Sequence, residues 1–220
     1  MNTQDLSELE QARIFTGISG EQIELLMDCV HGEVRTYDKD SYIFSAGDQI
    51  SQIGVVMEGQ LQVENIDYWG NAAIINLIGP GEIFGEAYSS PDSEPLPNDI
   101  RALTRCRVLF MDMHGILTTC QRACSFHNLL IQNLYMISTR RNRYMNRKIS
   151  HMSKRTTREK LLAYLSDEAQ RHDSRHFTIP FDRQQLADYL SVERSAMSAE
   201  LSRMQRDGLI SYHKNEYTLR

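Results

Sequence analysis

The 220-residue sequence has few cysteines and no long apolar run. Its 4 cysteines lack the dense spacing of a disulfide framework, so we expect reduced thiols, as in a cytoplasm. No apolar stretch approaches the roughly 20 residues of a membrane span. The N-terminus MNTQDLSELEQ also lacks the charged-then-apolar order of a signal peptide. These absences predict a soluble, cytoplasmic protein with no membrane partner.

The motifs of common enzyme classes are also missing. There is no histidine between residues 32 and 113, whereas a cupin-type metalloenzyme needs clustered histidine ligands on its strands. The sequence contains no GxSxG element, Walker loop or dinucleotide fingerprint. We therefore predict that the protein is not an enzyme.

Residues 181–209 have the pattern of two short helices joined by a tight turn at Ser191 and Val192. Asp182, followed three residues later by Gln185, is a start signal for the first helix. The second helix has an apolar stripe that faces inward, made of Met197, Leu201 and Met204. Its opposite face carries Arg194, Ser195, Ser198 and Ala199.

A helix with one long donor among short side chains can enter a major groove about 12 Å wide and present its arginine to guanine. After Gly208, the stretch LISYHKNEYTLR alternates like a small hairpin. The whole segment therefore predicts a winged helix-turn-helix. The alternative interpretation is an ordinary helical hairpin inside a core.

Charge is distributed unevenly along the chain. Residues 140–220 contain 17 Lys and Arg against 10 Asp and Glu, a formal charge of +7. Residues 1–139 contain 7 against 19, a formal charge of −12. A basic C-terminal third on an acidic body is typical of a protein with a polyanionic partner. For the densest basic run, Arg140 to Arg158, the alternative is a solvated helix face.

The N-terminal part consists of short alternating apolar runs broken by glycines, which indicate strands of about five residues. We predict strands at 42–44, 53–57, 61–66, 72–78 and 108–111, after a short helix at 22–30. Frequent turns favour a compact antiparallel barrel or roll. The proline-rich segment 89–98 predicts an irregular loop inserted in it.

A long helical pattern runs from Ile116 to Met152 without proline or glycine. A four-three alternation follows Leu130, Leu134, Ile137, Arg141, Tyr144, Lys148 and His151. This stripe is too long for a small domain to bury, so we predict that a second copy lies along it, with the contact centred near residues 126–137. Thr156 and Glu159 then predict a capped helix over 159–169.

These parts in this order resemble the Crp/Fnr (catabolite activator / fumarate–nitrate regulator) family of bacterial transcription regulators. The resemblance covers essentially the whole chain. It is carried by GPGEIFGE at 79–86, the long helix, TTREKLLAYL at 156–165 and RQQLADYLSVERSAMSAELSRMQRDGLI at 183–210. It implies an α+β fold: an N-terminal antiparallel β-roll (a cyclic-nucleotide-binding-like jelly roll), a central dimerisation helix and a C-terminal winged helix-turn-helix. We place these parts at residues 1–115, 116–152 and 153–220.

The resemblance also implies partners and site residues. The partners are double-stranded DNA with a palindromic operator, RNA polymerase, a second copy of the chain and an unidentified small-molecule effector. Arg194 matches the family's base-reading arginine, and Arg183 and Gln184 match contacts to the phosphate backbone. Ser195 stands where many members have a glutamate. The predicted DNA contacts are Arg183, Gln184, Glu193, Arg194, Ser195, Ser198 and Arg203. The predicted effector contacts are Gly85, Glu86, Ala87, Tyr88, Arg101, Leu130 and Asn133.

The effector region departs from the cyclic-nucleotide-binding members, which grip the cyclic phosphate with Arg-Ser or Arg-Thr. The matching positions here hold Leu96 and Pro97. Leucine makes no charge-assisted hydrogen bond, and proline has no N–H to donate. Glu86 can still accept from a hydroxyl, and Arg101 can replace the missing arginine only by a different path. We predict that the protein does not bind cyclic AMP, and the sequence identifies no cofactor.

Iron–sulfur sensing is not predicted either. Cluster-bearing members place several cysteines near the N-terminus, whereas the first cysteine here is Cys29, and a cluster needs about four converging thiolates. Cys120 and Cys124 share a helix face with His127, with His114 upstream, a set that suits a metal, a haem ligand or a redox pair. The alternative is a pair of small buried apolar side chains. We assign no metal site.

Two functions from different classes follow. The first is a homodimeric, sequence-specific transcription regulator. In it, an effector bound between the roll and residues 126–137 moves the recognition helices toward or away from a spacing of roughly 34 Å. The second is a non-DNA interaction module, in which the roll binds a small molecule and the basic end docks an acidic protein or RNA.

Overall fold

A computed structural model of the chain describes residues 1–66, 69, 72–90, 92–118 and 125–220. The chain divides into two compact units, residues 1–138 and 139–220. Each unit has its own apolar core. None of the helices in the described ranges is long and apolar enough to span a membrane.

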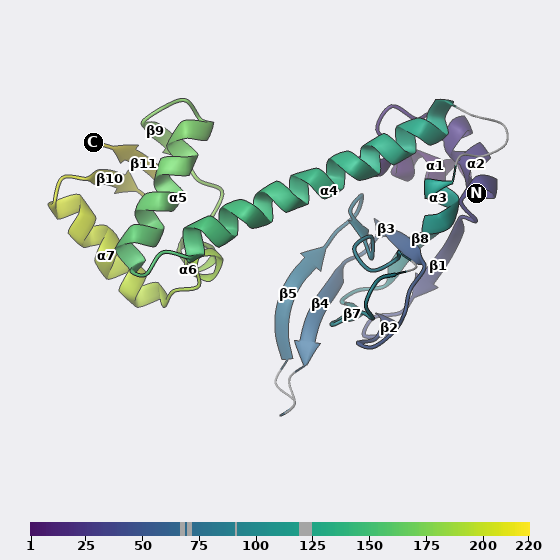
Figure 1. Cartoon of the computed structure of the whole chain (residues 1–220), viewed down its shortest axis with the longest axis horizontal. Coiled ribbons are helices and arrows are strands. Elements are labelled where there is room, and N and C mark those ends of the chain that lie inside the picture. The colour runs from purple at the N-terminus through teal and green to yellow at the C-terminus, as the bar shows by residue number, and fades with distance from the viewer. Residues whose placement is uncertain (67–68, 70–71, 91, 119–124) are drawn as a thin grey trace. The chain divides into compact units, whose positions relative to one another are not determined.

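The first unit combines helices from both of its ends with a set of short strands (Figure 1). The helices are α1 (Thr3–Glu10), η1 (Arg13–Phe15), α2 (Gly20–Cys29), α3 (Met113–Leu117) and the beginning of α4 (Ser125–Met152). The strands are β1 (Glu33–Tyr37), β2 (Tyr42–Phe44), β3 (Gln52–Glu58), β4 (Leu61–Ile66), β5 (Ala72–Ile78), β6 (Ile83–Phe84), β7 (Asp99–Ala102) and β8 (Cys106–Asp112).

These strands form two four-stranded antiparallel sheets, β1-β8-β3-β6 and β2-β7-β4-β5. Side chains from both sheets, among them Val56, Leu61 and Phe110, make one core. The first sheet contributes Ile53, Leu109 and others to a second core with α1, α2 and the beginning of α4. Strands β3 and β8 contribute side chains to both cores. Their sequences are therefore almost continuously apolar instead of alternating.

Gly54 in β3 lies against the ring of Phe84, so it gives a sensitive test of this packing. A Cβ added at Gly54 would lie 2.2 Å from Phe84 Cζ and 2.4 Å from Cε1. The ring is buried and packs edge-on against Phe110, so it has little room to move. We expect Gly54→Ala to lower the free energy of unfolding by about 1–3 kcal/mol, the usual cost of overpacking, as measured by denaturant titration.

Gly79→Ala is the matched control for this substitution. The nearest atom to its added Cβ is Glu82 Oε2, at 3.9 Å. This variant should unfold within about 0.5 kcal/mol of the wild type, since it introduces no clash. Equal stability of the two variants would contradict the packing described for Gly54.

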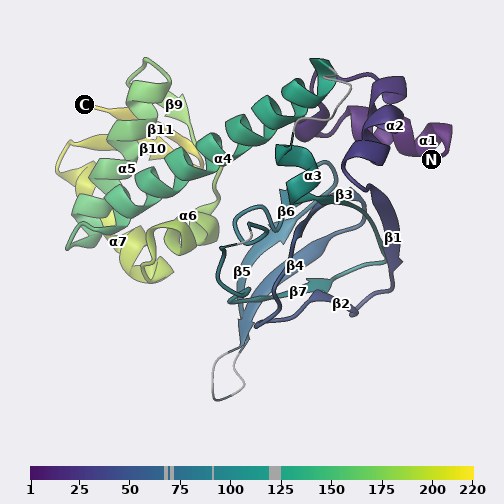
Figure 2. The same cartoon turned by 45° about the vertical axis from the view of Figure 1, so that its right-hand side comes forward.

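The second unit is a winged helix-turn-helix (Figure 2). It contains the end of α4, then α5 (Thr157–Arg171), β9 (His176–Thr178), α6 (Arg183–Leu190), α7 (Arg194–Arg206), β10 (Ile210–His213) and β11 (Glu216–Leu219). The strands form one antiparallel sheet in the order β10-β11-β9. The core side chains come from α5, α6, α7 and this sheet, and Leu161, Leu186, Leu201 and Tyr217 are fully buried.

Most predicted elements are confirmed, but the long helix is not continuous. The predicted strands coincide with β2, β3, β4, β5 and β8, and the predicted hairpin with β10 and β11. The helix predicted from Ile116 to Met152 is instead divided, because α3 ends at Leu117 and α4 begins at Ser125. Thr118 has extended backbone angles, φ −92° and ψ 120°. A β-branched residue favours this conformation over helix.

Candidate nucleic-acid interface and effector pocket

The helix-turn-helix is built by local hydrogen bonds and close packing. Asp182 caps α6 by accepting from the Gln185 N–H at 2.8 Å, and the Gln185 side chain accepts in return from the Asp182 N–H at 2.9 Å. Ser191 ends α6 in the left-handed region, with φ 49°. The predicted stripe Met197, Leu201 and Met204 is fully buried in the core. The opposite face of α7 is therefore turned outward.

The first turn of α7 presents a cation. Glu193 is the N-cap residue, and its carboxylate accepts from the N–H groups of Ser195 and Ala196 at 2.8 and 2.6 Å. These hydrogen bonds and one from the Ser195 hydroxyl lower the pKa of Glu193. Arg194 is exposed, and no carboxylate in the described part of the chain forms an ion pair with it. Its guanidinium is available to a ligand.

A groove of about 870 Å³ is lined by residues of this turn, of α6 and of the wing. Its lining residues are Thr178, Asp182, Arg183, Gln184, Arg194, His213, Lys214, Asn215 and Glu216. The sequence predicts Arg183, Gln184 and Arg194 as DNA contacts, but not the residues of the wing turn. The missed signal is Lys214, a cation in a two-residue turn between β10 and β11, with φ 52°. A groove lined by Arg183, Arg194 and Lys214 suits a phosphate backbone.

Arg183 is held by the wing, a contact that the sequence did not predict. Its guanidinium donates to the Tyr217 hydroxyl and lies over the rings of Tyr212 and Tyr217, at 4.6 and 5.6 Å from the centroids. Burial raises the pKa of Tyr217, although Arg183 acts in the opposite direction. Arg183 thus fixes the wing against the N-terminus of α6, and its predicted phosphate contact stays a prediction.

The other predicted DNA contacts lie on exposed or half-exposed parts of α6 and α7. Gln184 donates to Asp188 Oδ1 at 2.8 Å, and Ser198 donates to the Arg194 carbonyl at 2.9 Å. Arg203 is exposed two turns further along α7 and pairs with Glu200 Oε2 at 3.3 Å. The first turn of α7 and the wing therefore line the candidate interface, and Arg203 lies further along α7.

One member of the predicted basic run has a structural role. Arg158 in α5 pairs with Glu200 at 2.5 Å and with Asp207 at 2.6 Å, so it joins α5 to α7. The hydrogen bond from Arg158 is the main cause of the lowered pKa of Glu200. Arg158 is therefore neutralised within the unit, unlike Arg194.

Both ends of the predicted dimer stripe on α4 face the chain's own cores. Leu130 is fully buried and Leu134 is 7% exposed, both in the core with α1 and α2. At the other end, His151 is buried and its Nδ1 lies 3.1 Å from the Tyr189 hydroxyl of α6. Burial lowers the pKa of His151. These contacts cover both ends of the stripe, whereas Tyr144 near its middle is 40% exposed, so the predicted dimer contact stays a prediction.

Three of the five large exposed apolar residues described on α4 lie one position further along; the other two are Met136 and Tyr144. Tyr135 is 68% exposed, Met145 52% and Ile149 63%. Together with Ser138, Asn142, Met152 and Ile131, which is partly buried against the core of the first unit, they follow a four-three spacing, which is the spacing of a coiled-coil seam. We call Ile131, Tyr135, Ser138, Asn142, Met145, Ile149 and Met152 the outer seam.

The predicted effector residues lie on separate parts of the first unit: the turn after β6, strand β7 and helix α4. Gly85 has φ +85° and begins a turn that contains Glu86, Ala87 and Tyr88. Arg101 pairs with Asp40 at 3.0 Å and with the buried Glu64 at 3.3 Å, so its charge is already compensated. Asn133 donates to the carbonyls of Ile14 and Thr16, both at 2.9 Å. Leu130 and Asn133 thus contact the N-terminal helical segment, and their predicted effector contact stays a prediction.

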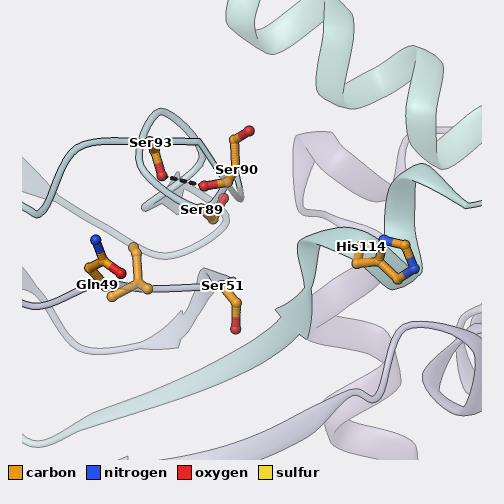
Figure 3. Close-up of a pocket in the computed structure, with 7 residues that line it drawn as sticks. Gln49, Ser51, Ser89, Ser90, Ser93 and His114 are labelled. Carbon is orange, nitrogen blue, oxygen red and sulfur yellow. Dashed lines mark hydrogen bonds between the residues drawn. The ribbon is translucent and has the colours of Figure 1, made fainter.

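A polar cavity of about 350 Å³ lies next to this turn (Figure 3). Its lining residues are Gln49, Ile50, Ser51, Ser89, Ser90, Ser93 and His114. Ser89 is 2% exposed, and its hydroxyl has no hydrogen-bond partner among the described residues. The Ser93 hydroxyl lies within hydrogen-bond distance of the carbonyls of Tyr88 and Ser90, so its one proton is shared between them or donated to one, beside the cavity. Neither lysine nor arginine lines it.

The cysteine hypothesis falls largely outside the described residues, which do not include Cys120 and Cys124. His127 is buried, and its Nε2 lies 2.8 Å from the Ile116 carbonyl. In the described ranges there is no group of three or more His, Cys, Asp or Glu side chains placed to hold a metal.

Comparisons with known proteins agree with this architecture. Residues 34–123 match the model of the cyclic nucleotide-binding domain, and residues 159–220 match that of the Crp-like helix-turn-helix domain. The chain is 24% identical over 190 residues to the transcriptional activator protein FnrA of Stutzerimonas stutzeri, covering 83% of this chain and 74% of that protein.

Two solved structures share the fold. The catabolite activator protein of Thermus thermophilus is 21% identical, with a TM-score of 0.50 over 95% of this chain and 94% of that one. CprK complexed with OCPA is 16% identical, with a TM-score of 0.59 over 90% and 91%. A cyclic-nucleotide-binding-type β-roll and a Crp-like helix-turn-helix define a DNA-binding transcription regulator, which is not an enzyme. The chain belongs to the Crp/Fnr family.

Proposed function

We propose that the chain is a homodimeric regulator that reads a palindromic operator with α7 and is controlled by a small molecule bound in the first unit. The observation that carries the DNA part is Arg194, an exposed cation without an ion-pair partner among the described residues. It stands at the capped N-terminus of the helix-turn-helix's second helix, where such domains contact base edges. As a transcription regulator it acts in the cytoplasm, where RNA polymerase is its further partner.

Selection of duplexes from a randomised pool tests the DNA part of the proposal. The full-length protein should enrich a palindrome whose half-sites lie about one helical turn apart, and its affinity should fall steeply with salt. Equal affinity for every duplex would favour the alternative function, in which the basic end docks an acidic protein or RNA. Neutralisation of Arg158 within its own unit reduces the support for that alternative.

We propose that two copies meet along the outer seam of α4. The support is its four-three spacing and the exposure of Tyr135, Met145 and Ile149. Apolar side chains of this size gain about 1.5–3 kcal/mol each from full burial. A second copy is the natural occupant, because a palindromic site requires two recognition helices related by a twofold axis.

For the effector we propose the polar cavity beside Ser89 as the binding site. A buried hydroxyl without a partner costs about 1–3 kcal/mol, which a ligand's polar group would recover. The cavity lies within the size range of small-molecule sites, near its lower end of about 300 Å³. Because neither lysine nor arginine lines it, its hydroxyl, amide and imidazole groups suit a neutral polar molecule. Mass spectrometry of molecules retained on natively purified protein identifies this effector.

Cyclic AMP is expected not to bind with useful affinity. Leu96, at the position of the missing arginine, is 5% exposed, so its side chain is part of the packed interior. Arg101 is compensated by Glu64 and Asp40 and leaves a phosphodiester without a free counter-charge. Calorimetric titration should give no binding heat at micromolar ligand, with a known cyclic-AMP-binding regulator as the positive control. Micromolar or tighter binding would overturn this prediction.

A further inference from the structure

The hydroxyl groups on the outward face of α7 are all oriented by acceptors within the helix. Ser195 donates to Glu193 Oε2. Ser198 donates to the Arg194 carbonyl at 2.9 Å, and Ser202 to the Ser198 carbonyl at 3.0 Å. A serine hydroxyl has a single proton, so once that proton is donated inward only lone pairs are left for another partner.

Ser195 is the member of this set whose orientation depends on a side chain. Ser198 and Ser202 donate to helix carbonyls, which every helix provides at this spacing. Ser195 lies in the first turn and donates to a carboxylate that also accepts from two backbone N–H groups, those of Ser195 and Ala196. An ionised carboxylate can only accept, so the direction of the Ser195 hydrogen bond follows from the chemistry of Glu193. The lowered pKa of Glu193 keeps it ionised near neutral pH.

The four bases differ in what they offer such a group in the major groove. Cytosine presents an N4 amine and adenine an N6 amine, both donors. Guanine presents only the acceptors N7 and O6, and thymine the acceptor O4 and a methyl group. An unconstrained serine can pair with either kind of base, because its hydroxyl can donate or accept. A serine whose proton is already donated to another group can only accept, so it can pair only with a base that donates.

We propose that Ser195 reads its base only as a hydrogen-bond acceptor, with Glu193 setting this polarity, so that the half-site carries cytosine or adenine at the contacted position. This inference rests on the proposed function. In this arrangement Glu193 caps the helix and orients the Ser195 hydroxyl, while Ser195 contacts the base. Arg194 beside them supplies the donor of the recognition surface.

Substitution of Glu193 tests the polarity directly. In the wild type, Glu193 Oε1 accepts from the Ser195 N–H, and Oε2 accepts from the Ala196 N–H and the Ser195 hydroxyl. In Glu193→Gln, an amide oxygen at the first position keeps the Ser195 N–H cap, while the amide nitrogen at the second gives up the Ala196 N–H bond, donates to Ser195 Oγ and turns its proton outward. The full-length variant should therefore invert the preference at one base pair from cytosine or adenine to guanine or thymine. Glu193→Asp is the matched control, because it retains a carboxylate acceptor and an N-cap, and it should keep the wild-type preference.

The readout is the ratio of affinities for duplexes that differ at a single base pair of the selected operator. In the wild type this ratio should be about three- to tenfold, the effect of one neutral hydrogen bond. Ser195→Ala should reduce it to about onefold at that pair and leave the other pairs unchanged. Removal of the Glu193 charge also raises affinity for all duplexes alike, which cancels in the ratio. Circular dichroism confirms that each variant is folded.

The outcomes separate this inference from the proposed function. If the wild type selects no operator, the proposed function fails, and this inference fails with it. If an operator is selected but no position depends on Ser195, or that position prefers guanine or thymine in the wild type, only the inference is wrong. Retention of cytosine or adenine by a folded, DNA-binding Glu193→Gln variant also overturns it.

Discussion

Arg194→Ala is expected to abolish recognition of the operator while leaving the protein folded. A bidentate arginine–guanine contact contributes about 1–3 kcal/mol of discrimination. A twofold-symmetric dimer uses it twice, so affinity for the selected palindrome should fall roughly 30-fold or more. Arg194 has no ion-pair partner in the described structure and is fully outside the core, so its removal costs the fold little. Fluorescence anisotropy with labelled duplexes measures both specific and non-specific affinity.

Arg206→Ala is the control for the loss of charge. Arg206 is exposed at the other end of the same helix, in its last turn. Its removal should weaken binding to all duplexes by a similar small factor and leave the base preferences intact. If Arg194→Ala behaves in the same way as Arg206→Ala, the base-reading role of Arg194 is refuted.

Ile149→Glu is expected to convert the dimer into monomers. Ile149 is 63% exposed on the outer seam, where a second copy would cover it. A carboxylate at this position would be buried without a partner and would face its equivalent across the twofold axis, an arrangement that costs about 3 kcal/mol or more. The dimer dissociation constant should rise by roughly 100-fold or more, and operator affinity should fall with it. Light scattering after size exclusion compares the mass with the 25.4 kDa of one chain.

Ser150→Glu is the control for a charge placed on α4 outside the outer seam. Ser150 is the next residue, is also exposed, and points about 100° away around α4. Ser150→Glu adds the same charge at nearly the same place along α4, so any effect of that charge on the helix or on DNA binding is the same in the two variants. Because Ser150 lies off the outer seam, this variant should stay dimeric. A monomeric wild type, or a dimer that tolerates Ile149→Glu, would exclude the outer seam as the contact.

The sequence by itself determined the elements whose signals are local. The pairs Thr156–Glu159 and Asp182–Gln185 predict helix starts, and both form reciprocal capping boxes. The apolar runs at 53–57 and 108–111 predict strands. Such a short apolar run is visible in the sequence itself, without knowledge of which strands pair with it. The stripe Met197, Leu201, Met204 likewise predicts the inner face of α7, and so the outward position of Arg194.

Only the tertiary structure decided which face of α4 is free and which cations are engaged. Positions 130 and 134, and positions 131 and 135, both fit a four-three pattern, but they lie about 100° apart around the helix. The choice between them depends on contacts with α1, α2 and α6, segments distant in the sequence. The same holds for Arg101 and Arg183, whose partners Glu64 and Tyr217 lie more than 30 residues away along the chain. Local hydrogen bonds and periodicity define an element, whereas long-range packing defines which of its side chains a ligand can reach.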